Sequence, residues 1–226
     1  MAGTGACRSG LTAVYMIPMR RYPAVTAAMA ILLACVAATA SAGGRNEPAR
    51  PQPAPVSEPD GPDTGLQLDP ETVALLADMG MMAFEQRIPS EDFSLPLLGG
   101  GEMTLAEHAG SVVFLNFWAT WCPPCREEMP SMQVLYDELR EEGLAMIAVN
   151  VLEDEATARA FIEEFGFTYP VPLDRNGRVM LRYGVRAYPT TYIIDRTGHV
   201  IGVRPGYHDW ATDEVIAAMR SLLSNP

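Results

Sequence analysis

Four stretches in the second half of the chain have the apolar pattern and the length of β-strands: residues 112–118, 144–151, 190–195 and 199–204. The first two are almost continuously apolar, which is typical of strands that are buried on both faces of a sheet. The last two flank a short turn that ends in glycine, and this arrangement predicts an antiparallel hairpin.

Helices are predicted between and after these strands. One follows the first strand over residues 123–142, and a second begins after the cap residue Asp154 and ends near residues 165–166. A closing amphipathic helix is predicted over residues 210–223. Strands that are first parallel and then antiparallel, with helices between them, predict an α/β fold with a mixed sheet flanked by helices on both faces.

An accessory helix is predicted before the main domain. Asp69 and Pro70 have the character of an N-cap and a first-turn proline, and apolar residues follow them at helical spacing. The pattern predicts a helix through about Gln86, and we assign residues 67–90 to this accessory element.

The main domain, residues 91–226, is predicted to open with an N-terminal hairpin. Its strands are residues 93–97 and 102–105, and three consecutive glycines join them. Glycine supplies the backbone conformations that a tight turn requires.

The first third of the chain differs in composition from the rest. Arg20 and Arg21 precede an uncharged apolar run over residues 24–38, so residues 1–42 are predicted to be an export signal or membrane anchor. Residues 43–66 are rich in Pro, Gly, Ala and charged residues, with almost nothing apolar, which predicts a flexible linker.

Three fates of this leader stay open. Residues 32–35 resemble a lipoprotein box, which makes Cys35 a candidate lipidation site. Residues 38–42 contain small-residue cleavage sites, and the uncharged run is just long enough to span a bilayer uncleaved. Each fate places the domain outside the cytoplasm, in the periplasm or cell envelope.

Charge excludes some classes of function. The formal net charge is −12, and the chain has no run of clustered cations of the kind that neutralises nucleic acid phosphates. Every fixed side-chain cation is arginine, which excludes Schiff-base catalysis by lysine.

Two of the four cysteines, Cys122 and Cys125, are alone in the predicted domain. A pair separated by two residues at a strand-to-helix junction can open and close a small disulfide. We expect Cys122 to be exposed there and to act as the nucleophile, because a helix N-terminus favours its thiolate, and Cys125 to be the resolving thiol. A structural disulfide and half of a metal site remain alternatives.

Residues 117–126, Phe-Trp-Ala-Thr-Trp-Cys-Pro-Pro-Cys-Arg, resemble the active-site segment of thioredoxin-like proteins, specifically the TlpA/ResA group of thiol-disulfide oxidoreductases. Asn116, residues 149–153 and residues 188–191 carry further marks of this group. The resemblance covers about residues 91–223 and implies a thioredoxin-like fold. It strengthens the redox interpretation of the cysteine pair well beyond the spacing alone.

The resemblance also implies which residues surround the disulfide. Pro189 matches a cis-proline that faces the disulfide and offers a backbone edge to an extended substrate. Trp121 is expected to form a lid, whereas Trp118 is expected in the core. The residues expected to bind substrate are Trp121, Pro123, Pro124, Tyr188 and Pro189.

A carboxylate near the resolving cysteine is the third implied catalytic group. Thioredoxins proper have a buried aspartate where this chain has Asn116, and an amide does not exchange protons near neutral pH. Glu128 follows Cys125 by one helical turn and matches a glutamate that modulates the thiols in the ResA-like group. The alternative is an ordinary solvated glutamate like Glu127.

The resemblance implies an envelope reductase that needs no cofactor other than its own disulfide. Its expected partners are disulfide-containing envelope proteins, such as cytochrome c apoproteins or copper-site cysteines of an oxidase, and a membrane-bound thiol donor. His108, His199 and His208 are expected at the surface, and no metal site is predicted.

Two alternative functions remain open. One is a copper-binding module that uses the same cysteines with a distant histidine. The other is a thioredoxin-fold peroxidase, although Ala119 stands where such enzymes usually have a threonine.

Overall fold

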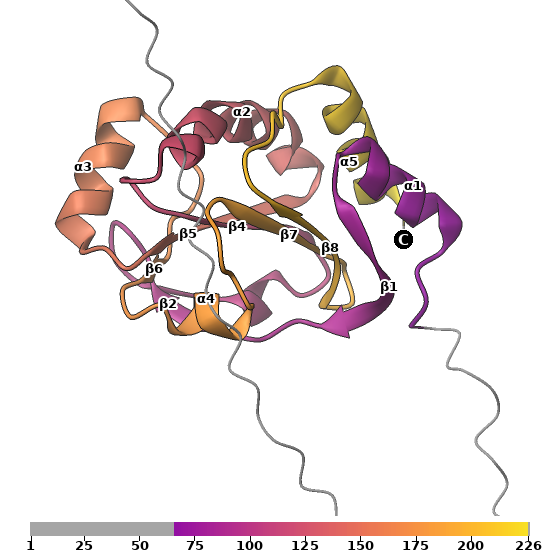
Figure 1. Ribbon diagram of the computed structural model, residues 1–226, viewed down its shortest axis with the longest axis horizontal. Coiled ribbons are helices and arrows are strands. Elements are labelled where there is room, and N and C mark those ends of the chain that lie inside the picture. The colour runs from indigo at the N-terminus through magenta and orange to yellow at the C-terminus, as the bar shows by residue number, and fades with distance from the viewer. Residues whose placement is uncertain (1–65, 226) are drawn as a thin grey trace, which may run out of the picture. The chain divides into compact units, whose positions relative to one another are not determined.

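The computed structural model describes residues 66–225 of the chain (Figure 1). The predicted leader, its cysteine Cys35 and nearly all of the predicted linker lie outside the described residues. Within residues 66–225, no helix is long and apolar enough to cross a membrane.

A six-stranded mixed sheet forms the centre of the described fold, with the strand order β1-β8-β7-β4-β5-β6. Its strands are β1 (Met82–Pro89), β4 (Val112–Trp118), β5 (Leu144–Val151), β6 (Leu173–Asp174), β7 (Thr190–Ile194) and β8 (His199–Pro205). β4, β5 and β6 pair in parallel, whereas β7 is antiparallel to both β4 and β8, and β1 is antiparallel to β8. A separate hairpin joins β2 (Ser94–Pro96) to β3 (Glu102–Thr104).

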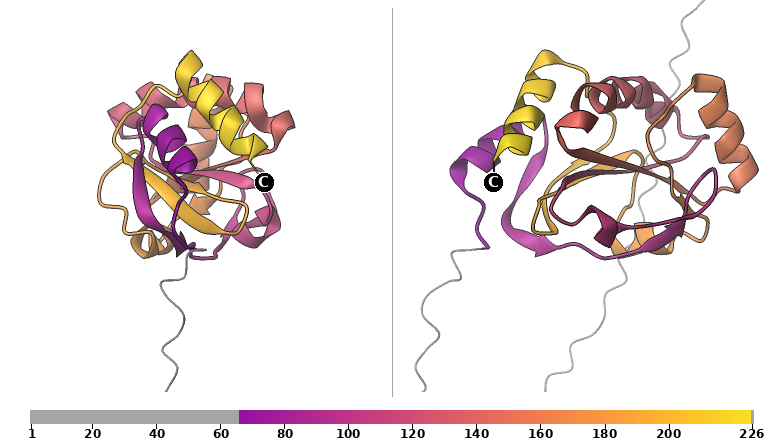
Figure 2. Two further views of the ribbon diagram at one scale, coloured as in Figure 1. Left: turned by 90° about the vertical axis from the view of Figure 1, so that its right-hand side faces the viewer. Right: turned by 180° about the vertical axis from the view of Figure 1, so that it is seen from behind.

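Helices lie on both sides of this sheet, as the sequence predicts. They are α1 (Pro70–Asp78), α2 (Pro123–Leu139), α3 (Glu155–Phe165), α4 (Arg178–Arg182) and α5 (Asp213–Ser224), with short 3-10 helices at Leu105–His108 and Arg140–Glu142. Figures 1 and 2 show α1, α2 and α5 on one side, and α4 with the β2–β3 hairpin on the other. The start of α3 after its cap Asp154 matches the predicted pattern closely, and so do the strands β4, β5, β7 and β8.

The central strand β4 positions the cysteine pair. All seven of its residues are buried, because β5 flanks one edge and β7 the other while helices and loops cover its faces. Phe117 pairs with Val149 of β5 and with Thr190 of β7. The chain that leaves β4 therefore emerges between the end of β5 and the start of β7.

The predicted accessory helix is wrong in its second half. α1 ends at Asp78, and Gly80 adopts the left-handed conformation, with φ of +66°, that commonly terminates helices. The N–H of Met81 bonds back to the carbonyl of Leu76 at 2.9 Å, which closes the helix end. The following residues, including Gln86, form β1, which pairs antiparallel with the edge of β8.

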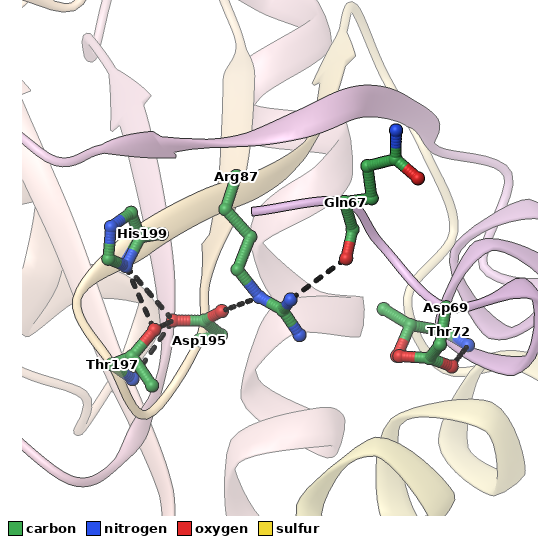
Figure 3. Close-up of polar contacts among 7 residues, drawn as sticks. All are labelled: Gln67, Asp69, Thr72, Arg87, Asp195, Thr197 and His199. Atoms are coloured by element: carbon green, nitrogen blue, oxygen red, sulfur yellow. Dashed lines mark hydrogen bonds and ion pairs between the residues drawn. The ribbon is translucent and has the colours of Figure 1, made fainter. Parts of the chain in front are cut away.

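Polar contacts fasten this N-terminal segment to the sheet (Figure 3). The Arg87 guanidinium donates from Nε to Asp195 at 2.9 Å and from Nη1 to the carbonyl of Gln67 at 3.0 Å. Asp69 caps α1 by accepting from the N–H of Thr72 at 2.8 Å. The segment assigned to an accessory helix thus contributes an edge strand to the domain itself.

Candidate active site

The two cysteines lie at the start of α2, directly after the buried strand β4. Cys122 is the N-cap of α2, Cys125 lies in its first turn, and the two form a disulfide with 5.3 Å between their Cα atoms. The N–H of Cys125 donates to Sγ of Cys122 at 3.3 Å. A helix N-terminus that directs an N–H at this sulfur favours the thiolate of Cys122 once the disulfide opens.

The two prolines determine which N–H is available. Pro123 and Pro124 occupy the first two helical positions and have no N–H, so Cys125 is the first residue of α2 that can donate one. That donor is directed at Cys122. Pro123 is exposed and Pro124 is half-buried, so both present surface beside the disulfide.

The expectation that Cys122 is exposed was wrong for the disulfide form. Only 4% of Cys122 and 1% of Cys125 are accessible to solvent. In this form Sγ of Cys122 is bonded to Cys125 and accepts from the Cys125 N–H, so the side chain lies against the first turn of α2. Cys122 nevertheless remains the more accessible of the two cysteines.

Two aromatic side chains stand beside the disulfide. The rings of Trp121 and Tyr188 meet edge to face with 5.7 Å between their centroids, and 59% of Trp121 is exposed. Trp118 is fully buried and donates from Nε1 to the carbonyl of Ala148 at 3.1 Å. The predicted division between an exposed Trp121 and a core Trp118 is confirmed.

Pro189 precedes β7, and the Tyr188–Pro189 peptide bond is cis. Because Thr190 pairs with Phe117, this bond lies next to the point where β4 ends. The Pro189 carbonyl accepts from the N–H of Gly206 at 2.7 Å. Among residues 66–225, the backbone N–H and C=O of Tyr188 have no hydrogen-bond partner, which leaves them open to an extended chain.

Glu128 is fully buried, one turn after Cys125 on α2, whereas its neighbour Glu127 is exposed. Its Oε1 accepts from Nδ2 of Asn116 at 2.8 Å, and its Oε2 accepts from the N–H of His208 at 3.0 Å. The same Nδ2 donates to the hydroxyl of Thr191 at 2.9 Å. Strands β4 and β7 and the loop before α5 therefore hold this carboxyl group in place.

Burial raises the pKa of Glu128 from its ordinary 4.5 to about 8. Hydrogen bonds from the His208 backbone and from the Asn116 side chain oppose this rise, as does the positive charge of Arg204. The carboxyl group of Glu128 thus takes up and releases a proton close to neutral pH, which is the range that a general acid or base needs.

Polar atoms without partners surround this carboxyl group. Within the part of the chain that the structure describes, the Tyr169 hydroxyl, the Trp210 indole N–H and Oδ1 of Asn116 are buried without a hydrogen bond. Burial and the nearby charge of Glu128 raise the pKa of Tyr169 well above its usual value. Sequence reasoning missed Tyr169 and Trp210, because no local motif connects either residue to Glu128.

Glu153 fixes the loop between β4 and the cysteines. Its carboxylate accepts from the N–H of Thr120 at 2.8 Å and from Nδ2 of Asn150 at 2.7 Å, and it also accepts a short hydrogen bond from the Thr120 hydroxyl. The sequence marked Glu153 only as part of the resemblance. Its hydrogen bond to Thr120 depends on the fold, which brings the loop after β5 next to the loop after β4.

The three histidines are less exposed than expected. All three are half-buried rather than fully exposed. Nδ1 of His199 lies 2.8 Å from the hydroxyl of Thr197 (Figure 3), and the His208 ring packs 4.7 Å from that of Trp210. Among the described residues, no group of three or more His, Cys, Asp or Glu side chains is placed to hold a metal ion.

A Cys-X-X-Cys pair at the N-terminus of the helix that follows a central strand, opposite a cis-proline, is the arrangement found in thioredoxin-fold domains, and the described domain is of that class. The model of one family matches residues 85–203, which include this whole arrangement. The chain belongs to the AhpC/TSA family.

Curated relatives carry a more specific description. The chain is 43% identical over 115 residues to the thiol-disulfide oxidoreductase ResA of Halalkalibacterium halodurans, a match that covers 51% of this chain and 65% of the relative. It is 46% identical over 109 residues to ResA of Geobacillus thermodenitrificans, over 48% of this chain and 63% of the relative. The chain thus spans less than two thirds of the length of these relatives.

Solved structures agree on the fold. A protein of Chlorobium tepidum, provisionally assigned as the thiol:disulfide interchange protein DsbE, is 31% identical with a TM-score of 0.56, and the match covers 61% of this chain and 96% of that one. A secreted thiol-disulfide isomerase of Corynebacterium glutamicum is 24% identical with a TM-score of 0.57, over 64% and 92% of the two chains. The second likeness concerns the fold alone.

Proposed function

We propose that this protein is a thiol-disulfide oxidoreductase that reduces disulfides of exported proteins with the dithiol of Cys122 and Cys125. The observation that carries the proposal is the disulfide at the start of α2, beside the exposed Trp121 and the unpaired backbone of Tyr188. The likeness to the ResA proteins supports the same chemistry.

Reduction of a substrate proceeds in two exchanges. The Cys122 thiolate attacks one sulfur of the substrate disulfide, that S–S bond breaks, and one substrate thiolate leaves. Cys125 then loses its proton and attacks Sγ of Cys122, which releases the second substrate thiolate. The protein ends as the Cys122–Cys125 disulfide, and two electrons have passed to the substrate.

Glu128 is the proposed acceptor of the Cys125 proton. Its position one turn along α2 places it on the same side of the helix as Cys125, and its pKa of about 8 suits proton transfer near neutral pH. After the exchange, the backbone N–H of His208 and the amide of Asn116 hold the carboxyl group where it is, ready for the next cycle.

The proposed location is the cell envelope, and the proposed donor is a membrane-bound thiol protein. The leader pattern at residues 1–42 and the likeness to ResA support this location. Cytochrome c apoproteins and copper-site cysteines are the proposed substrates. Fractionation of cells that express the full chain tests the location, and recovery in the cytoplasm alone would contradict it.

A single-turnover assay tests the activity. The reduced chain, mixed with a peptide that contains one disulfide, should release the peptide dithiol and gain the Cys122–Cys125 disulfide in equal amounts. The Cys122→Ser variant should do neither. Failure of the reduced wild-type protein to reduce any peptide disulfide would overturn the proposal.

The same sample separates the peroxidase alternative from the reductase. Membership of the AhpC/TSA family makes a peroxide assay worthwhile, although Ala119 replaces the threonine usual in such enzymes. Rapid oxidation of the dithiol by hydrogen peroxide, together with no reaction with disulfides, would favour the peroxidase.

A further inference from the structure

The chain between β6 and the cis-proline is strongly basic in an otherwise acidic protein. Residues 175–186 contain four arginines and no Asp or Glu, while the whole chain has a net charge of −12. The arginines are Arg175, Arg178, Arg182 and Arg186, which are three or four residues apart and therefore form no continuous run in the sequence. All four are exposed.

Three of these arginines line a groove of about 700 Å³. One wall is the strand β2, and the other is the segment that contains β6 and α4 (Figure 1). Arg175, Arg178 and Arg182 contribute charge to the groove, while Leu95 and Val179 contribute apolar surface. We call this space the arginine groove.

The one carboxylate in the lining does not neutralise the arginine groove. Asp174 is only 2% exposed, and its two oxygens accept from the N–H groups of Arg178 and Met180 at 2.9 Å each. Its negative charge is therefore stabilised by backbone N–H groups of α4 rather than by the arginine side chains. The lining itself therefore has three arginine side chains against one buried carboxylate.

Two of the basic side chains have no partner in the described part of the protein. Arg175 pairs with Glu155 at 3.0 Å and Arg182 lies 3.9 Å from Glu91, both at exposed positions. Arg178 forms no ion pair or side-chain hydrogen bond within residues 66–225, and the same is true of Arg186. Their charges remain available to a ligand.

A chain of contacts connects the arginine groove to the disulfide. The Tyr188 hydroxyl donates to Sδ of Met180, which lies on α4 between Arg178 and Arg182, at 2.7 Å. The Tyr188 ring also meets Trp121, the residue before Cys122. Tyr188 and Met180 therefore connect α4 (Arg178–Arg182), which carries two of the groove's arginines, to the residue that precedes Cys122.

We propose that the arginine groove binds acidic side chains of the protein substrate, located a few residues from the cysteine that Cys122 attacks. The proposal rests on the proposed reductase function and specifies its substrate class. A polypeptide fits better than a small anion, because apolar surface at Trp121, Tyr188 and Met180 separates the positive charges from the disulfide. Because the net charge of the whole chain is −12, an acidic substrate gains a favourable electrostatic contact where arginines gather, as they do in this groove.

Two peptides test the proposal, and each contains the same single intramolecular disulfide. One has a glutamate-rich flank after its second cysteine, and the other has a glutamine-rich flank of equal length. The reduced 226-residue chain should reduce the glutamate-rich peptide about threefold to tenfold faster under single-turnover conditions at low salt, the range expected for a few exposed ion pairs. High salt should abolish the preference.

Matched double variants locate the effect. Arg178→Gln combined with Arg182→Gln should bring the ratio of the two rate constants to within about twofold of unity. Arg140→Gln combined with Arg220→Gln changes the net charge equally, at sites outside the groove whose side chains are 46% and 43% exposed, and should keep the preference. Loss of preference in both double variants would show that net charge, rather than the groove, selects the substrate.

Other outcomes separate this proposal from the function on which it rests. Equal rates for the two peptides with the wild-type protein would overturn the acidic-substrate proposal and leave the reductase function intact. No reduction of either peptide would overturn the function itself. Equal rates combined with binding to anionic phospholipid vesicles, lost in the Arg178→Gln, Arg182→Gln protein, would assign the groove to a membrane surface instead.

Discussion

Asn116 on β4 donates a hydrogen bond to Glu128 on α2 at 2.8 Å, and both side chains are completely buried. The amide takes the position at which thioredoxins proper have an ionisable carboxyl group. In this chain the ionisable group lies instead on α2, at Glu128. Asn116 itself does not titrate. Its role is to orient the Glu128 carboxyl group and to stabilise its anionic form, which limits the rise of its pKa.

The first prediction concerns stability and pH. Below about pH 4.5, the folded and unfolded chains both hold the Glu128 proton. Between that pH and about 8 only the folded chain does, because burial raises the folded-state pKa. Stability should therefore fall as pH rises through this window, by at most about 5 kcal/mol from this group.

Glu128→Gln should remove this part of the pH dependence. The oxidised variant should lose less stability than the wild type between about pH 5 and about pH 9, as measured by urea unfolding at each pH. Glu127→Gln is the matched control, because Glu127 is exposed and should leave the curve unchanged. Identical pH dependence in Glu128→Gln and wild type would mean that Glu128 does not titrate in this window.

The second prediction concerns turnover. Glu128→Gln removes the proton acceptor for Cys125 and should slow resolution of the mixed disulfide by about tenfold to a hundredfold, up to the lower end of the range of general acid–base effects. A plot of this rate against pH should also lose the change that the wild type shows near the pKa of Glu128. Equal slowing in Glu127→Gln would indicate a general effect of charge rather than a positioned base.

The third prediction concerns the two thiols. In the reduced protein, Cys122 should react rapidly with iodoacetamide near neutral pH, because the N–H of Cys125 and the helix N-terminus favour its thiolate. Cys125 should react slowly. Mass spectrometry of the labelled peptide checks the order. Unchanged labelling in Cys122→Ala, with loss of labelling in Cys125→Ala, would reverse the roles.

The sequence predicts the elements around the disulfide well because their signals are local. The apolar run of β4, the cap of α3 and the turn before β8 each lie within a few residues of the elements that they determine. β1 was missed for the opposite reason. Its partner strand β8 lies more than a hundred residues away, and the pattern after Gly80 fits a helix as well as an edge strand.

The residues of the candidate site also fall into these two groups, those with local signals and those that only the fold brings together. Cys122, Cys125 and Glu128 belong to one helix, so their spacing places them together. The polar surroundings of Glu128 come from Asn116, Thr191 and His208, which only the folded sheet brings together. The sequence did not predict the arginine groove because its three arginines are spaced over a short helix and the turn before it and form no continuous run.

The fourth prediction concerns the loop before the cysteines. Glu153→Ala should lower the free energy of unfolding by about 1–3 kcal/mol, because it leaves the N–H of Thr120 and the amide of Asn150 without their acceptor. Hydrogen exchange at the Thr120 amide should also become faster. Glu164→Ala, at an exposed position on α3, is the control. Unchanged exchange at Thr120 would show that the loop is held by other contacts.

The last prediction links the end of α1 to the carboxyl group of Glu128. Gly80 has a φ of +66°, and a Cβ atom at this position would lie 2.8 Å from Cε1 of His208. Gly184 has a φ of +67°, but a Cβ atom there meets nothing within 4 Å. A comparison of the two alanine variants therefore separates the steric contact from the cost of the left-handed backbone.

Gly184→Ala should lower the free energy of unfolding by about 1 kcal/mol, the backbone cost alone, and Gly80→Ala by about 2–3 kcal/mol. The His208 ring must move to admit the new methyl group, and this movement should weaken the bond from the His208 N–H to Oε2 of Glu128. Because that bond is the largest of the interactions that lower the pKa of Glu128, its weakening should raise the pKa further. Gly80→Ala should therefore extend the fall in stability to higher pH, whereas Gly184→Ala should not. Equal losses in both variants, with superimposable pH profiles, would show that His208 moves aside without disturbing the carboxyl group.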